Sequence, residues 1–203
     1  MEWNQFILRV RQQLETANFS GDFPKEHPLT RAIALGLRPL FAESFGVSDE
    51  QDLHYHVVYR DGDEDEDRKA WTLIQKVKWV NVLGMDFVPD VLVIRGRLRT
   101  ATDDPISVLP IEVKLAKQRA FSAEFARAVG QCLVYSVRYQ PSILFVGVQP
   151  GVIYGTRGLR NVTAANETVE DRKFRERLEQ HGIALIFRDV GAPTDGTRST
   201  TPV

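Results

Sequence analysis

The chain has 203 residues, of which 43% are hydrophobic and 26% are charged, values typical of a soluble globular domain. A single cysteine excludes an internal disulfide and a cysteine-rich zinc site, and no apolar run approaches the roughly 20 residues that a membrane-spanning helix needs. The net charge of −1 gives no global sign of a nucleic-acid-binding protein, and we expect a cytoplasmic protein with no membrane partner.

The N-terminal part is predicted to be helical. Apolar residues from Trp3 to Leu14 recur every three or four positions, and they predict an amphipathic helix over residues 2–16. A loop containing glycine and prolines follows. A second helix is expected over residues 29–45, and Pro39 must kink or restart it because proline lacks the amide hydrogen of a helix interior.

The next segments carry mixed signals. Residues 53–60 read as a strand, and the six acids within residues 61–67 repel one another and predict an exposed loop. Residues 70–80 are ambiguous between strand and helix, although the alternation of apolar and polar residues from Trp71 to Trp79 favours a strand.

The second half alternates strands and helices. We expect strands at 91–94, 109–115, 143–148 and 183–188, and helices at 122–139 and 169–181. This order predicts an α/β protein in which helices flank a mixed central sheet. We expect one domain over residues 1–190, and the polar segment 191–203 is predicted to be a disordered tail.

Three charged residues lie at strand positions. Asp90 follows a proline at the start of one predicted strand, while Glu112 and Lys114 lie two positions apart inside the next and therefore share a face. If the two strands pair in antiparallel fashion, Asp90 approaches Glu112. Two adjacent carboxylates repel each other, and Mg²⁺ relieves that repulsion because it prefers oxygen ligands and is commonly shared with substrate phosphates.

The pair Pro89-Asp90 and the triplet Glu112-Val113-Lys114, separated by 22 positions, resemble the signature of the PD-(D/E)xK nuclease superfamily. The resemblance implies that Asp90, Glu112 and the Val113 backbone carbonyl bind Mg²⁺, for which Mn²⁺ can substitute. It also implies that Lys114 assists the attacking water.

The same resemblance implies a fold. Members share a restriction-endonuclease-like αβββαβ core, which corresponds here to residues about 29–148. The helix at 2–16 and the helix and strand within 169–188 are then peripheral.

A second match lies on the predicted helix 122–139. Gln131 and Tyr135 resemble the Gln-x-x-x-Tyr motif of the RecB-like branch, and they are neighbours at i, i+4. The resemblance implies that Gln131 belongs to the catalytic group and that this helix face holds phosphates or positions Lys114. Four residues are the candidates for contacting substrate: Tyr135, Arg127, Lys117 and Arg119.

Many members of the superfamily carry a further acid on the first core helix. Glu43 is the candidate third metal-binding acid here, with Glu26 as the alternative. RecB-like relatives use a histidine at this place, which makes His27 a weaker candidate.

The expected function is metal-dependent hydrolysis of phosphodiester bonds in nucleic acid, with DNA favoured over RNA. The alternative is a binding module for nucleic acid or protein that keeps the fold without turnover, or a subunit active only with a partner, because a fold alone does not establish an activity. A homodimer or a partner protein is compatible with the sequence. The chain is close to a minimal core, which favours structure-, end- or partner-directed cutting over sequence-specific cutting.

Overall fold

A computed structural model describes most of the chain. The described residues are 1–21, 23–46, 57–60, 68, 71–72, 80–96, 107–117, 121–149 and 168–191. Several sequence predictions lie outside them: the first residues of the strand at 53–60, the acidic loop 61–67, most of the segment 70–80, Arg119, and the tail from residue 192 onward.

The fold is built on a five-stranded mixed sheet with the strand order β1-β4-β5-β6-β7. β4 is antiparallel to both β1 and β5, whereas β6 is parallel to β5 and to β7. The strands are β1 (Val57–Tyr59), β4 (Val91–Arg95), β5 (Ser107–Ala116), β6 (Ser142–Val148) and β7 (Ile183–Asp189). β4, which Asp90 precedes, and β5, which carries Glu112, are antiparallel, so the condition under which Asp90 approaches Glu112 is met.

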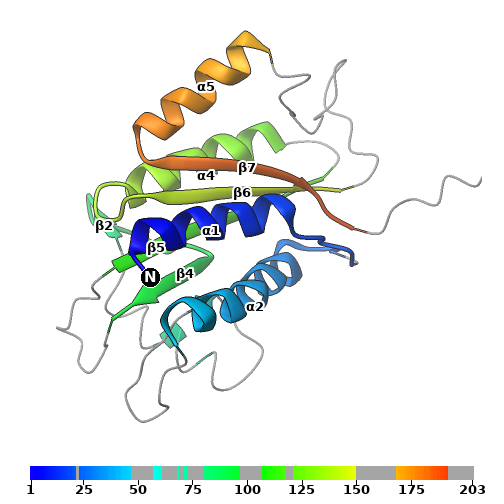
Figure 1. Cartoon of the computed structure of the whole chain (residues 1–203). Helices are drawn as coiled ribbons and strands as arrows, with labels where there is room; N and C mark the ends of the chain where they lie inside the picture. Colours follow the sequence, from blue (N-terminus) through cyan, green and yellow to red (C-terminus); the bar gives the residue numbers. More distant parts are fainter. Residues whose placement is uncertain are drawn as a thin grey trace, which may run out of the picture.

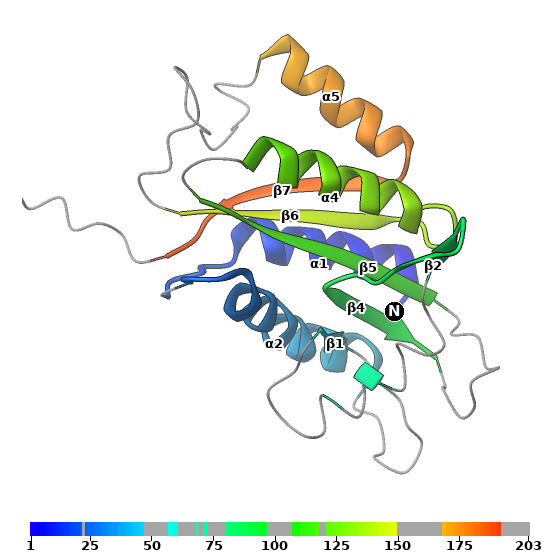
Figure 2. The ribbon, with the colours of Figure 1, turned by 180° about the vertical axis from the view of Figure 1, so that it is seen from behind.

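Helices cover both faces of this sheet. α1 (Trp3–Thr16) and α2 (Glu26–Phe45) lie on one face, and α4 (Phe121–Tyr135) and α5 (Val169–Gln180) lie on the other (Figures 1 and 2). The predicted α/β protein with a mixed sheet flanked by helices is thus confirmed. None of the helices in the described ranges is both long enough and apolar enough to cross a bilayer.

Alternation along the strands explains the two-sided packing. On β4, Val91 and Val93 join the core beneath α1 and α2, whereas Leu92 and Ile94 join the core beneath α4 and α5. Successive strand residues point to opposite faces, so a strand apolar on both faces must be covered on both. β6 follows the same rule, and all seven of its residues are buried.

α2 begins earlier than the apolar pattern predicts. The helix starts at Glu26 instead of residue 29, because Pro28 falls in its first turn, where an amide hydrogen has no intrahelical partner anyway. Pro39 does not restart the helix, which continues to Phe45. The earlier start places Glu26 on the first turn of α2, and this changes the composition of the site described below.

Two other elements differ from the sequence predictions. Residues 71–72 are helical, which contradicts the predicted strand there, and Trp71 is buried against the α4 side of the sheet. Burial of a large aromatic ring satisfies the same apolar pattern in either conformation. A small hairpin of β2 (Val80–Val82) and β3 (Met85–Phe87) follows. α4 ends at Tyr135 and not at residue 139, and residues 136–138 form a turn.

The β4–β5 pair is open at one end. Its last paired residues are Val91 and Ile111, yet β5 continues to Ala116 alongside β6. Among the described residues, no strand pairs with β5 on its β4 side from residue 112 onward. Backbone groups on that edge need other partners, because buried and unpaired backbone groups are costly.

Gly147 sets how closely α2 approaches the sheet. A Cβ atom at this position of β6 would lie 2.6 Å from Leu29 Cδ2 and about 3.0 Å from the Val190 side chain. Only glycine allows this approach without a shift of the neighbours. The close contact fixes the first turn of α2 against the sheet, near the open edge of β5.

Candidate functional site at the open edge of β5

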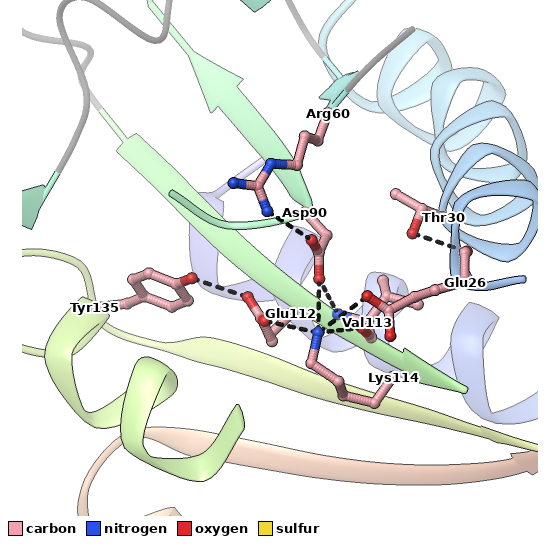
Figure 3. Close-up of polar contacts among 8 residues, drawn as sticks. All are labelled: Glu26, Thr30, Arg60, Asp90, Glu112, Val113, Lys114 and Tyr135. Atoms are coloured by element: carbon pink, nitrogen blue, oxygen red, sulfur yellow. Dashed lines mark hydrogen bonds and ion pairs between the residues drawn. The ribbon is translucent and has the colours of Figure 1, made fainter. Parts of the chain in front are cut away.

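Two carboxylates cap the open edge of β5. The Val113 amide donates to Asp90 Oδ2 at 2.9 Å, and the Leu115 amide favours the ionised form of the nearby Glu26 carboxyl by lowering its pKa slightly. These amides are two positions apart and point to the same side, where β4 would continue if it were longer. Asp90 and Glu26 are thus held at this edge by backbone geometry, one from the start of β4 and the other from the start of α2 (Figure 3).

The Lys114 ammonium lies at the centre of this group (Figure 3). Its Nζ is 2.9 Å from Glu112 Oε1, 3.1 Å from Glu26 Oε1 and 3.5 Å from Asp90 Oδ2. It also donates to the Val113 carbonyl at 2.8 Å. Four oxygens from three elements therefore surround one cation, and we call these five residues the carboxylate cluster.

Glu112 is the most deeply buried member of the carboxylate cluster, with 1% of its side chain exposed. Its second oxygen, Oε2, accepts a hydrogen bond of 2.8 Å from the Tyr135 hydroxyl on α4. Tyr135 is itself fully buried. Since both oxygens of Glu112 accept hydrogen bonds, the arrangement suits the ionised carboxylate.

Asp90 lies between two cations. Lys114 approaches its Oδ2, and the Arg60 guanidinium lies 3.8 Å from its Oδ1. The Arg60 amide also donates to the Asp90 carbonyl at 2.9 Å, which continues the β1–β4 pairing by one residue. Arg60 was not among the sequence candidates, because only the register of β1 on β4 brings it to this site.

The segment just before α2, close to Glu26, is held in place by hydrogen bonds to its backbone carbonyls. Gln149, just after β6, donates to the Phe23 carbonyl at 2.6 Å, and the Lys117 Nζ donates to the Pro24 carbonyl. Within α2, Thr30 Oγ1 donates to the Glu26 carbonyl. Lys117 was predicted to contact substrate, and the structure gives its ammonium this positioning contact.

Burial and mutual repulsion perturb the carboxylates. Burial, together with the nearby charge of Asp90, raises the pKa of Glu112 to about 8, although Lys114 and Tyr135 oppose that rise. Burial also raises the pKa of Glu26. Burial alone would lower the pKa of Lys114, but the charges of Asp90, Glu112 and Glu26 outweigh it and raise that pKa. When all three carboxyls are ionised, the cluster carries more negative charge than one ammonium offsets, which is why protonation of Glu112 and Glu26 is favoured.

The donor set suits a hard divalent cation. Carboxylate oxygens and a backbone carbonyl are the ligands that Mg²⁺ takes, and an excess of buried negative charge favours a doubly charged ion. Among the described residues, no group of three or more His, Cys, Asp or Glu side chains is arranged as a ready metal centre. The three acids of the cluster instead all contact the Lys114 ammonium.

The structure separates the other sequence candidates from the carboxylate cluster. Glu43 lies near the far end of α2, exposed and paired with Arg9 at 3.1 Å, so Glu26 and not Glu43 is the helix acid at this site. Gln131 is partly buried one turn before Tyr135, and Arg127 is exposed further along α4. Within the described part of the chain, neither is bonded to a member of the cluster.

Tyr135 also differs from its predicted role. It was a candidate for substrate contact, but its hydroxyl is buried beneath α4 and bonded to Glu112. On α4 and in the turn after it, Leu133 and Val137 are exposed, whereas Ala128, Cys132 and Tyr135 pack on the sheet. The helix thus turns Tyr135 toward the buried Glu112 carboxylate.

The chain matches no family model, no curated protein and no solved structure.

Proposed function

We propose that this protein is a metal-dependent nuclease of the PD-(D/E)xK type that hydrolyses phosphodiester bonds in DNA. One observation carries the proposal: the Asp90, Glu112 and Val113 oxygens, which the sequence resemblance names as Mg²⁺ ligands, converge on one point together with Glu26. The ammonium of Lys114, the lysine of the same signature, lies at that point.

The arrangement of the elements supports the same proposal. The restriction-endonuclease-like core has the order αβββαβ, and in the described ranges the chain runs α2, β1, β4, β5, α4, β6, with helical residues 71–72 and the β2–β3 hairpin between β1 and β4. The β4–β5 pairing ends beside Asp90 and Glu112, so both carboxylates lie at the open end of this pair, near the middle of the sheet. The pairing directions, antiparallel up to β5 and parallel beyond it, are compatible with this fold.

The residues present fit a divalent cation, and Asp90, Glu112, Glu26 and the Val113 carbonyl would hold it. When bound, Mg²⁺ supplies Lewis-acid stabilisation of a phosphate oxygen and lowers the pKa of a water. Asp90 and Glu112 are rigid supports for such an ion. Asp90 is fixed through the Val113 amide, and Glu112 is fixed through the Tyr135 hydroxyl.

Lys114 has two successive tasks under this proposal. While the carboxylates surround it, its pKa is raised and it stays an ammonium, which cannot accept a proton. If Asp90, Glu112 and Glu26 held a divalent cation, these carboxylates would raise the pKa of Lys114 less. Lys114, whose backbone is fixed on β5, would then orient the attacking water, help to deprotonate it, and offset the negative charge that develops at phosphorus.

The test is a cleavage assay on circular, linear, single-stranded and branched DNA and on RNA, with Mg²⁺, Mn²⁺ or EDTA. We expect wild-type protein to cut DNA only with a divalent cation, and Lys114→Ala to lose at least about a hundredfold in rate, the scale of one general acid–base contribution. Lys173→Ala, an exposed lysine on α5, is the matched control and should cut like wild type.

The alternative is a binding module on the same fold. The closed ion network around Lys114 favours it, because such a network is complete without any metal. DNA binding with no cleavage on any substrate, and with no Mg²⁺ effect on binding or stability, would support the module and refute the nuclease.

A further inference from the structure

Among the described residues, the Arg60 side chain makes a longer and more exposed contact than the other charged residues at the carboxylate cluster. Its guanidinium is 3.8 Å from Asp90 Oδ1, beyond hydrogen-bonding distance, and half of its side chain is exposed. An ion pair of this length and exposure contributes little to stability. The contact with Asp90 alone therefore gives little reason for a guanidinium at this place.

The backbone of Arg60, in contrast, is fixed. Its amide donates to the Asp90 carbonyl at 2.9 Å, so it is the residue directly after β1 and directly beside the first residue of the signature. The side chain leaves from this fixed point toward the outer side of Asp90, opposite Lys114 (Figure 3). The exposed fraction rises from 1% for Glu112 to 13% for Lys114 and 50% for Arg60. Arg60 thus lies at the rim of the buried cluster.

The charges of the cluster change sign when a divalent cation binds. Three carboxylates against the Lys114 ammonium and the Arg60 guanidinium leave one negative charge when all are ionised. With a divalent cation held by these carboxylates, the sum would be one positive charge, and Asp90 would be shared between that cation and Arg60. A phosphodiester group carries one negative charge, and a guanidinium binds two phosphate oxygens at once.

From this geometry we propose that Arg60 is a substrate-binding residue, which grips a phosphate of the nucleic-acid backbone at the rim of the metal site. This inference rests on the proposed nuclease function. A backbone phosphate is the same in every sequence, so Arg60 contributes to affinity and to the position of the strand, not to sequence preference. It is the contact through which the strand is aligned with the carboxylate cluster.

The experiment measures binding of a fluorescently labelled DNA duplex to the full chain at several salt concentrations, with Ca²⁺ replacing Mg²⁺ to limit cleavage. Removing one positively charged side chain that contacts a phosphate reduces the slope of log K against log salt concentration by about 0.9. It also weakens binding to the same extent for every DNA sequence. We expect this reduction and roughly tenfold weaker binding for Arg60→Gln, with partial recovery for Arg60→Lys. Arg177→Gln on α5, at the other edge of the sheet, is the matched control.

A second measurement separates binding from a structural role. If Arg60 only positions Asp90, Arg60→Gln will lose the Mg²⁺-induced rise in melting temperature and will keep the salt slope, which overturns the proposal. The proposal is also overturned if Arg60→Gln keeps both the slope and the affinity, as it would if the acids of residues 61–67 neutralised it. Wild-type protein that neither binds nor cuts DNA, although the variants fold, would instead refute the nuclease function itself.

Discussion

The buried Lys114 ammonium and the three carboxylates around it stabilise one another through their opposite charges. The Lys114 ammonium contacts Glu26, Asp90 and Glu112, and only 13% of its side chain is exposed. Removing one partner of a buried ion pair costs far more than the pair itself contributes, because the remaining charges are left uncompensated. The cluster therefore couples the stability of the protein to the presence of a cation.

We predict that Lys114→Met destabilises the protein by about 3–5 kcal/mol in EDTA, the cost of leaving buried charges unpaired. Mg²⁺ should recover most of this loss, since the ion replaces the missing positive charge. Urea unfolding of wild type and variant, with EDTA and with Mg²⁺, measures both effects. Lys173→Met is the control, and equal destabilisation of the variant with and without Mg²⁺ would contradict the prediction.

At the level of elements, the first turn of α2 decides which acid reaches the site. The apolar pattern places the helix start at residue 29, and this choice leaves Glu26 in a loop and favours Glu43. Pro28 in the first turn and the glutamate before it are the signals of an earlier start. The presence of this helix was thus predictable, but the predicted first residue was wrong. That first turn decides which acid belongs to the site.

Gly147 tests how α2 is fixed to the sheet. We predict that Gly147→Ala destabilises the protein by about 1–3 kcal/mol, because the added methyl group overlaps Leu29 Cδ2. In a double-mutant cycle with Leu29→Ala, measured by urea unfolding, the cost of the Gly147 change should largely disappear. Gly36→Ala on α2 is the control: its Cβ meets nothing within 4 Å, so it should be neutral or stabilising. Additive effects at positions 147 and 29 would exclude the overlap.

The N-terminus of α5 gives a prediction on pH. Thr168 and Asp171 form a capping box, in which the Thr168 amide and hydroxyl donate to the Asp171 carboxylate. These hydrogen bonds lower the pKa of Asp171. Because the pKa of Asp171 is lower in the folded state, the ionised cap contributes to the free energy of unfolding at pH values above the pKa in the unfolded chain, about 3.9. This contribution is lost as pH falls through the pKa in the folded state.

We predict that Asp171→Asn costs about 1 kcal/mol at pH 7, the usual size of a helix cap. The difference from wild type should shrink as pH falls below about 3.9, because wild type loses the ionised cap there. Urea unfolding across this pH range measures the difference. A difference that stays constant down to the lowest pH at which both proteins fold would contradict the assignment.

At the scale of the whole molecule, the candidate site joins segments that are distant in the sequence. Strand alternation and the pairing of the strands at 91–94 and 109–115 were predictable, and they bring Asp90 close to Glu112 and Lys114. The early end of β4 against β5, and the register that brings Arg60 beside Asp90, were not. Both depend on long-range pairing, for which a local pattern carries no signal. Short sequence motifs therefore predicted the central residues of the candidate site, whereas Arg60 at its rim is identified only from the tertiary structure.

The cluster connects α2, β4, β5 and, through Tyr135, α4, so an ion bound there stabilises the folded chain as a whole. We predict that Mg²⁺ raises the free energy of unfolding of wild type by about 2.7 kcal/mol at a hundred times its dissociation constant. Hydrogen exchange should slow most in the first turn of α2 and at Val113. Asp90→Asn should abolish the stabilisation and Glu43→Gln should retain it, because Glu43 is paired with Arg9 at the far end of α2. Equal Mg²⁺ stabilisation of both variants would place the ion elsewhere and remove the metal from this site.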